Sequence, residues 1–308
     1  MAGKSQFSSD MADLLIPLAG LLLGVGNVWF VDSGHDDAQD SSGRGRTVAT
    51  PFSSLGFAVG QTTPNNGDLI FVSPGHSENV TAADAIRFGT NATGVTVIGI
   101  GNGTDRPTFN FTTVTTADIE VDVANITLRN LYFDMTGIDA LAAGIDVNAS
   151  NFSMIGCEIL QTDSGGQCLR AIDLDGNAND SKIVNCKIHG ETAGDGDEAI
   201  GISGTLSGLE IRHCWIDGNY DLACIWSDQA FTEGLIHDCY LRNQLTGQLA
   251  IEFTAAATGM LVKNYYHSDV DPAAAGPQAI DPGSMFSYEC YANDTINASG
   301  ILEPEVIT

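Results

Sequence analysis

The sequence predicts an all-β protein that winds as a parallel β-helix, a solenoid of stacked coils around a shared hydrophobic interior. The first observation is a short Ile-x-Val-like pattern that recurs along the chain, usually with a small residue before the isoleucine. Its isoleucines are Ile86, Ile119, Ile145, Ile172, Ile200, Ile225, Ile251 and Ile280. The second observation is an alternating apolar run that ends in a position most often held by cysteine, which we call the cysteine slot. We assign the slot to Ile100, Leu131, Cys157, Cys186, Cys214, Cys239, Tyr265 and Cys290.

Both series keep one slightly elastic period, between 25 residues (Cys214 to Cys239) and 33 residues (Ile86 to Ile119). Two series with a shared period of this size are typical of a solenoid. The alternation predicts two short strands per repeat, joined by turns that are too short for a helical crossover. One repeat therefore fits one coil, stacked about 4.8 Å from the next. The isoleucines and the slot residues should form two inward-facing ladders.

This coil pattern covers residues 27–293 and resembles the right-handed parallel β-helix family. That family has the pectin-lyase-like fold of pectate lyases, phage tailspikes and many virion proteins. The resemblance implies a right-handed parallel β-helix. It implies little about activity, because the fold carries many unrelated functions.

The composition narrows the class of partner. The chain has 308 residues, a formal net charge of −27 and 12 lysine and arginine residues. Nucleic-acid binding needs basic clusters for phosphate contacts, so the charge argues against a nucleic-acid partner. The 7 cysteines are an odd number at positions that the coil pattern determines. We therefore predict buried free thiols rather than a disulfide framework.

Residues 1–26 differ from the rest of the chain, because residues 14–23 are its most apolar run. The run is too short for a transmembrane helix, which needs about 20 apolar residues. It also lacks the basic start and small-residue cleavage site of a signal peptide, which stays the alternative. We predict a docking or anchor segment that contacts an assembly. The contact residues would be Leu14, Leu15, Ile16, Leu18, Leu21, Leu22 and Leu23.

Residues 27–66 are predicted to hold an opening strand, a polar loop and a short capping helix. The strand is Val28–Val31, followed by Asp32-Ser33-Gly34, and Thr50 and Pro51 are helix-start signals for a segment ending near Val59. The order resembles the N-terminal cap of many β-helix proteins, and a cap would cover the open end of the core. We place the β-helix proper at residues 67–292 and a C-terminal tail at residues 293–308.

Acidic residues flank the inward isoleucines, so they should point outward and stack on neighbouring coils. They are Glu120, Asp122, Asp146, Asp173 and Asp175. Stacked carboxylates repel, and calcium, which takes six to eight oxygen ligands, would relieve the repulsion. The alternative is a solvated acidic face without a metal, and we expect no other cofactor. Pectate-lyase-like enzymes use such carboxylates with an arginine base, and Arg170 precedes the Asp173 coil. We find no further match and assign no catalytic residue.

Three aromatic residues are predicted to face outward as well, namely Trp215, Trp226 and Tyr240. Aromatic side chains are enriched both on sugar-binding surfaces and between subunits, so a glycan contact and a subunit contact both stay open.

An apolar N-terminal segment followed directly by a capped β-helix resembles the layout of virion proteins of tailed viruses. From this resemblance we expect a structural virion protein on the particle surface: a capsid decoration protein, head fibre or spike. The expected partners are capsid or other virion proteins, two further copies in a homotrimer, and a host-surface glycan. We expect neither nucleic acid nor a membrane span. The alternatives are a tailspike-like polysaccharide lyase or hydrolase and a secreted surface adhesin.

Overall fold

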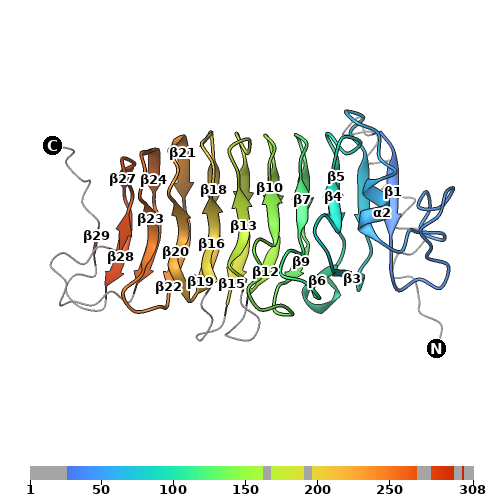
Figure 1. Cartoon of the computed structure of the whole chain (residues 1–308), viewed down its shortest axis with the longest axis horizontal. Coiled ribbons are helices and arrows are strands. Elements are labelled where there is room, and N and C mark those ends of the chain that lie inside the picture. The colour runs from blue at the N-terminus through green and yellow to red at the C-terminus, as the bar shows by residue number, and fades with distance from the viewer. Residues whose placement is uncertain (1–25, 162–167, 191–195, 269–278, 295–299, 302–308) are drawn as a thin grey trace.

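The chain folds as a parallel β-helix whose coils follow one another along the long axis, with the N-terminal and C-terminal coils at opposite ends (Figure 1). The computed structural model describes residues 26–161, 168–190, 196–268, 279–294 and 300–301. Within these residues the strands form three sheets, and every strand pair is parallel except β28 with β29. The predicted all-β parallel β-helix is confirmed.

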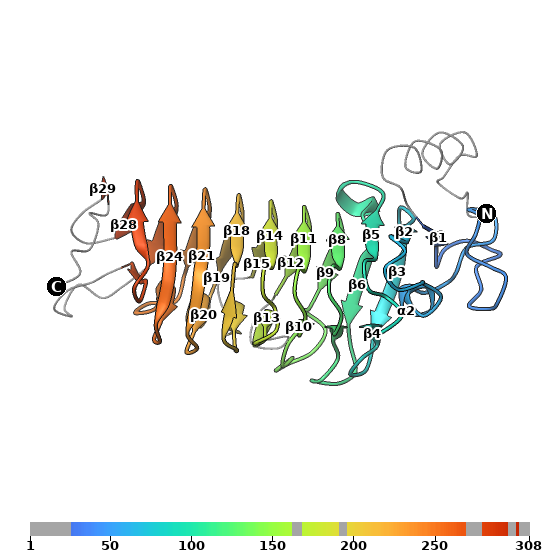
Figure 2. The ribbon, with the colours of Figure 1, turned by 90° about the horizontal axis from the view of Figure 1, so that it is seen from above.

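Sheet A runs the length of the molecule, and its strands lie side by side when seen from above (Figure 2). Its strands are β1 (Val28–Val31), β2 (Leu69–Val72), β5 (Thr96–Gly99), β8 (Thr127–Arg129), β11 (Ser153–Ile155), β14 (Lys182–Val184), β18 (Glu210–Arg212), β21 (Phe231–His237), β24 (Ala257–Val262) and β27 (Phe286–Tyr288), with β17 (Leu206–Ser207) beside β21.

Sheets B and C complete each coil. Sheet B contains β3 (Ser77–Val80), β6 (Thr108–Phe111), β9 (Tyr132–Asp134), β12 (Glu158–Leu160), β15 (Lys187–His189), β19 (Trp215–Gly218), β22 (Tyr240–Asn243), β25 (Tyr265–Ser268), β28 (Tyr291–Asp294) and β29 (Gly300–Ile301). Sheet C contains β4 (Ile86–Phe88), β7 (Ile119–Val121), β10 (Ile145–Val147), β13 (Arg170–Leu174), β16 (Gly196–Ile202), β20 (Tyr220–Ser227), β23 (Leu249–Phe253) and β26 (Ile280–Asp281).

A coil therefore has three strands, and the prediction of two strands per repeat is wrong. The run from Phe152 to Ile159 is not one strand but two, β11 in sheet A and β12 in sheet B. The chain turns between them at Gly156, whose φ is 64°, a backbone conformation that suits glycine. Gly156 and Cys157 separate the two strands, and the inward positions on either side of the corner, Met154 and Cys157, lie three residues apart instead of two.

The predicted isoleucine ladder lies in sheet C with its members in register. Ile145 pairs with Ile119 on one side and with Ile172 on the other, and the same register continues to both ends of the sheet. All eight isoleucines are buried in the core. Burying one such side chain contributes about 1.5–3 kcal/mol, so this ladder is a main source of stability.

The cysteine slot lies at the corner between sheets A and B, where the thiol donates weak hydrogen bonds to backbone carbonyl oxygens. Cys214 Sγ donates to the carbonyl oxygen of Arg212 at 3.3 Å and lies 3.4 Å from that of Ile183 on the preceding coil. The same pair of contacts recurs at Cys157, Cys186, Cys239 and Cys290. The Arg212 carbonyl also accepts from the Asn185 N–H at 2.9 Å, so the thiol adds a second, weak hydrogen bond at the corner.

Tyr265 does not occupy the slot, and its assignment there is wrong by one residue. Tyr240 pairs with Tyr265, which places Asn264 beside Cys239 at the corner. The buried Asn264 amide donates to the Ile236 carbonyl at 2.7 Å and accepts from the Cys239 N–H at 3.0 Å. An asparagine thus replaces the thiol at one coil, and the tyrosine next to it faces outward.

The cysteines are free and buried, so we expect them to resist a thiol reagent in the folded protein. Burial also raises the pKa of the Cys157 thiol, which removes the reactive thiolate. Titration with Ellman's reagent should leave Cys157, Cys186, Cys214 and Cys239 unmodified in buffer and label them in urea. A Thr232→Cys variant, at an exposed position, is the control that should react in buffer. Rapid labelling of all four buried cysteines without urea would contradict the observed register.

The N-terminal end of the core is covered by β1, the loop after it and helix α2 (Leu55–Val59). The helix begins four residues later than the sequence signals predict, because Phe52 forms a bridge with Val31 instead of entering the helix. Ser54 is the N-cap and accepts from the Phe57 N–H at 3.2 Å. One further short helix, the 3-10 helix η1 (Gly103–Asp105), lies in a turn.

A buried histidine ties this cap to the first coil. His76 Nδ1 accepts from the Ser33 N–H at 3.0 Å, so its proton lies on Nε2, which faces Glu78 Oε2 at 3.2 Å. The same Glu78 oxygen accepts from the Leu55 N–H at 2.6 Å, at the start of α2. These contacts hold the loop and the helix against the end of the solenoid.

Candidate functional site

The outer face of sheet C carries the predicted acidic residues in one line. Asp146 pairs with Glu120 on one side and with Asp173 on the other, and we call these three residues the carboxylate ladder. Arg87 precedes the ladder in the same column, and Gly201 follows it. The structure therefore brings together the stacked carboxylates of three successive coils.

Two of the ladder carboxylates, Glu120 and Asp146, stand in surroundings that disfavour their charge. Burial raises the pKa of Glu120 to about 7, and a hydrogen bond with Asp122 adds to this, while the Asn148 amide, 2.6 Å away, opposes it. Burial and the neighbouring charge of Asp173 raise the pKa of Asp146 to about 6. Near neutral pH the ladder therefore holds protons that isolated carboxylates would have lost.

The other two predicted acidic residues lie beside the ladder. Asp122 accepts from Arg87 Nε at 2.7 Å, and the Arg87 Nη1 atom reaches Asp84 at 2.9 Å. Asp175 is exposed and follows β13. Arg87 thus offsets part of the negative charge at this end of the acidic face.

The deeper end of the ladder contains an ion-pair cluster of Arg170, Asp173 and Glu198. Arg170 Nε donates to Glu198 Oε1 at 2.7 Å, and its Nη1 atom donates to Asp173 Oδ2 at 3.2 Å. The Glu198 side chain is completely buried, and its Oε2 atom has no hydrogen-bond partner in the described structure. Burial raises the pKa of Glu198 to about 7, and the Arg170 charge limits that rise.

Gly201 provides the space for this cluster. A Cβ atom at Gly201 would lie 2.6 Å from Glu198 Oε1 and 3.3 Å from Arg170 Cδ. The acidic column has no carboxylate at Gly201, and the side chains of Arg170 and Glu198 occupy the space there instead.

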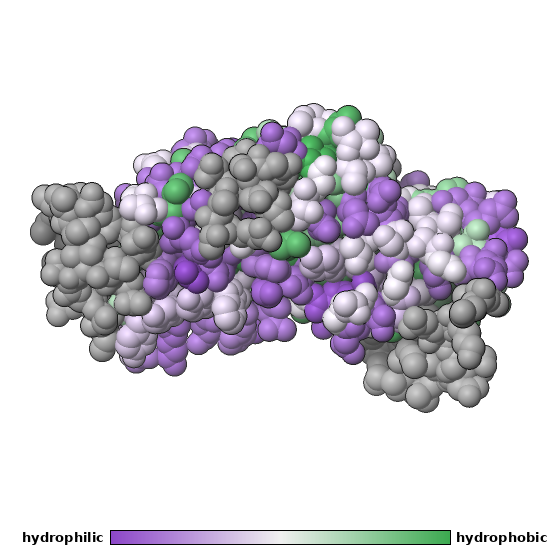
Figure 3. Space-filling model, turned by 90° about the horizontal axis from the view of Figure 1, so that it is seen from below, coloured by the Kyte–Doolittle hydropathy of each residue, from purple (hydrophilic) through white to green (hydrophobic). Residues whose placement is uncertain are grey.

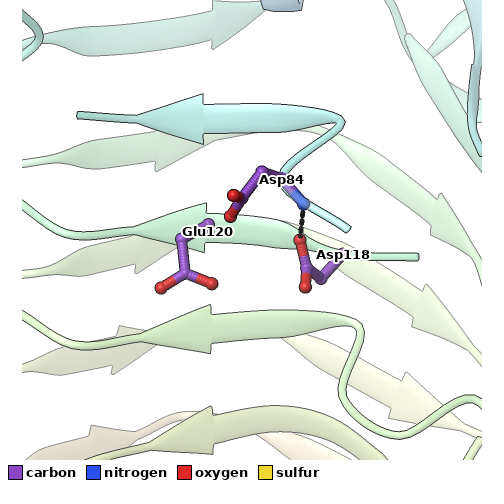
Figure 4. A group of neighbouring side chains, drawn as sticks. All are labelled: Asp84, Asp118 and Glu120. Atoms are coloured by element: carbon purple, nitrogen blue, oxygen red, sulfur yellow. Dashed lines mark hydrogen bonds between the residues drawn. The ribbon is translucent and has the colours of Figure 1, made fainter. Parts of the chain in front are cut away.

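Three carboxylates at the start of sheet C are the group in the described structure best placed to hold a cation. Asp84, Asp118 and Glu120 each offer an oxygen, and these oxygens lie within 4.8 Å of one another. Figure 4 shows the three side chains and the hydrogen bond from the Asp84 N–H to Asp118, 2.7 Å long. Such carboxylates fit calcium as ligands. Of the predicted metal ligands only Glu120 belongs to this group, and a bound calcium stays a prediction.

The ion-pair cluster of Arg170, Asp173 and Glu198 is poorly suited to a lyase mechanism in which an arginine acts as the base. A general base must release its proton near the working pH. Burial works against the charge of Arg170, but Glu198 and Asp173 outweigh it and raise the pKa of the guanidinium. Arg170 is held as a cation by two partners, which fits a structural role.

The predicted aromatic residues lie on two different sheets. Trp215 and Tyr240 pair in sheet B, with ring centroids 5.1 Å apart. Trp226 lies in sheet C, between Gly201 and Glu252 in the column of the carboxylate ladder. Sequence reasoning missed two exposed members of the sheet B column, Tyr265 and Tyr291, which extend it by two coils.

The predicted assembly contacts at residues 14–23 lie outside the described residues. In the part of the chain that the structure describes, no helix has the length and apolar character to cross a membrane. The face in Figure 3 is mostly hydrophilic, with hydrophobic residues in small separate patches.

No protein-family model matches the sequence, and the search of curated proteins gives no match. The crystal structure of pectate lyase Pel9A is similar over 88% of this chain and 78% of that enzyme, with 12% identity and a TM-score of 0.53. Two further structures are less similar. They are a rhamnogalacturonan lyase (11% identity, 90% of each chain, TM-score 0.47) and ORF18 of Geobacillus virus E2 (11% identity, 94% of this chain and 65% of that one, TM-score 0.38). At this identity the likeness to Pel9A shows the fold alone: this chain is a parallel β-helix of the pectate-lyase kind.

Proposed function

We propose that this protein is a structural component of a virus particle, a capsid decoration protein, head fibre or spike that exposes its β-helix on the particle surface. The observation that carries the proposal is the closed N-terminal end of the solenoid. Residues of β1 and α2 cover that end, with Leu55, Ala58 and Val59 buried. Because described residues of β1 and α2 already cover this end, we assign the apolar residues 14–23 to attachment to an assembly.

The ion-pair cluster of sheet C supports a structural role over catalysis. The arginine beside the carboxylates forms ion pairs with two of them, and the Glu198 side chain is buried from solvent. A polysaccharide lyase or hydrolase is the alternative, and a secreted adhesin is a third. A solenoid with stacked, mutually supporting coils is suited to display a long surface, and we expect a homotrimer as the displayed unit.

The test is to delete residues 2–26 and to express the remainder in cells in which the particles assemble. We expect a folded, soluble β-helix that no longer co-sediments with the particles, because burying each leucine or isoleucine of the run contributes about 1.5–3 kcal/mol to attachment. Several symmetric copies would act together, so losing the segment should abolish attachment instead of weakening it.

A deletion of residues 2–13 is the matched control, since it keeps the apolar run and should co-sediment like the full chain. Thermal unfolding of both deletions checks that the β-helix is intact. If the longer deletion still decorates particles at the wild-type level, residues 14–23 are not the anchor and a cleaved leader becomes the better explanation.

A further inference from the structure

Four aromatic residues form a column on the outer face of sheet B, and we call them the aromatic stripe: Trp215, Tyr240, Tyr265 and Tyr291. Trp215 is 52% exposed, Tyr265 37% and Tyr291 46%, while Tyr240 is half-buried. The stripe spans four successive coils, roughly 14 Å along the long axis at the usual strand spacing. It is straight because each residue pairs in register with the next.

The stripe offers ring edges and hydroxyl groups to a partner rather than open ring faces. The rings of Tyr240 and Tyr265 lie 5.3 Å apart and within 7° of parallel, so each covers a face of the other. Trp215 is tilted by 54° against Tyr240. A phenol hydroxyl both donates and accepts hydrogen bonds, so a row of tyrosines suits a partner rich in hydroxyl groups.

A polar column runs beside the stripe, two residues further along each strand. It consists of Asp217, Arg242 and His267 in register. Arg242 lies 3.6 Å from Asp217, and Gln244 donates to Asp217 at 2.7 Å. The column offers donors and acceptors of both charge signs, in contrast to the acidic face of sheet C.

These features fit a narrow, linear partner better than a second copy of the chain. A stable protein interface covers about 800 Å² on each partner and has a broad apolar centre. The aromatic stripe is one residue wide, and its neighbours along the strands are polar. From this geometry we propose that sheet B binds a linear, uncharged, hydroxyl-rich polysaccharide that lies along the stripe.

This inference deepens the proposed function, because a β-helix displayed on a particle would meet such chains on the surface of a host cell. The test below uses purified full-length protein without particles. A failure of glycan binding therefore leaves the attachment experiment unaffected, and a failure of attachment leaves glycan binding unaffected.

The test is affinity electrophoresis in native gels that contain hydroxyethyl cellulose, glucomannan, pullulan or laminarin. We expect at least one of these polysaccharides to retard the wild-type protein. Trp215→Ala and Tyr265→Ala should each raise the apparent Kd at least tenfold. Tyr265→Phe, which keeps the ring and removes the hydroxyl, should give a smaller increase. Trp226→Ala removes a half-exposed aromatic residue from sheet C and should bind like the wild type.

Thermal unfolding of each variant checks the fold, which these outward-facing side chains should not disturb. Two results would overturn the proposal. The first is that none of the four polysaccharides retards the wild-type protein, or that the wild type and all variants are retarded equally. The second is that purified Tyr265→Ala has a smaller oligomer mass than the wild-type protein in analytical ultracentrifugation. That result would assign the stripe to contact between copies of this chain.

Discussion

Replacing Arg170 by alanine should lower the free energy of unfolding by about 3 kcal/mol at pH 8, as measured by urea denaturation. The variant leaves the buried Glu198 without the one cationic partner that the described residues give it, and it removes a donor from Asp173. A buried carboxylate that loses its counter-charge is far more costly than an exposed one, because water cannot replace the missing interaction.

The loss should shrink as the pH falls from 8 to 5.5. The pKa of Glu198 in the fold is about 7, above its unfolded value, and removing Arg170 raises it further. An acid with a raised pKa binds its proton more tightly in the folded state. Its favourable contribution is therefore present at low pH and disappears as the pH rises through about 7. Protonated Glu198 no longer needs the guanidinium, which is why acid should rescue the variant.

Arg87→Ala is the matched control, since Arg87 also contacts two carboxylates of the same face but is exposed. Its midpoint of denaturation should stay close to that of the wild type at both pH values. Equal losses for the two arginine variants, or a loss for Arg170→Ala that does not depend on pH, would contradict the burial argument.

Gly204→Ala is expected to destabilise the protein by about 3 kcal/mol, or to prevent the coil from closing. A Cβ atom at this position would lie 2.0 Å from the Gly176 nitrogen and 2.4 Å from the Gly176 Cα. Gly176 belongs to the turn of the preceding coil, so the obstacle is backbone and cannot rotate away. The free energy of unfolding from urea denaturation is the measurement.

Gly89→Ala tests whether the effect comes from this close approach or from the loss of a glycine as such. A Cβ atom at Gly89 would meet nothing within 4 Å, and its φ lies outside the left-handed region. Alanine should therefore be neutral there, or stabilise the protein by up to about 1 kcal/mol through the unfolded chain. A similar loss in both variants would show that the backbone contact is not the cause.

The isoleucine ladder could be predicted because sheet C repeats one local pattern with one inward position per coil. Burial imposes the same residue type on every coil, and elastic loops change only the spacing. The bend between sheets A and B is missed when Phe152 to Ile159 is treated as one alternating run, although the inward residues Met154 and Cys157 lie three positions apart and break the strict alternation. A conformational signal was present, however: the equivalent residues Asn130, Asn185 and Asp238 also have positive φ and are types that tolerate it.

The residues around the acidic face were harder to find than the carboxylate ladder itself. Glu198 pairs with Arg170 near the starts of their strands, where the register of β16 shifts against β20. The repeat period therefore does not predict which residues lie side by side there. Asp118 could have been noticed as an acidic residue in the column of small residues that precede the isoleucines. Tyr265 was missed as a surface residue because the one-residue error at the slot placed it inside.

The parallel register of the three sheets also determines how the molecule carries mechanical load. Each backbone hydrogen bond between strands joins one coil to the next, so these bonds point along the long axis. Compression along this axis is resisted by packed ladders of side chains in contact from coil to coil. Tension along it loads every junction between coils, and at each junction the hydrogen bonds of all three sheets share the load. Such a rod is stiff when pushed from its tip, and under a pull it should part at one junction while the coils on either side stay wound.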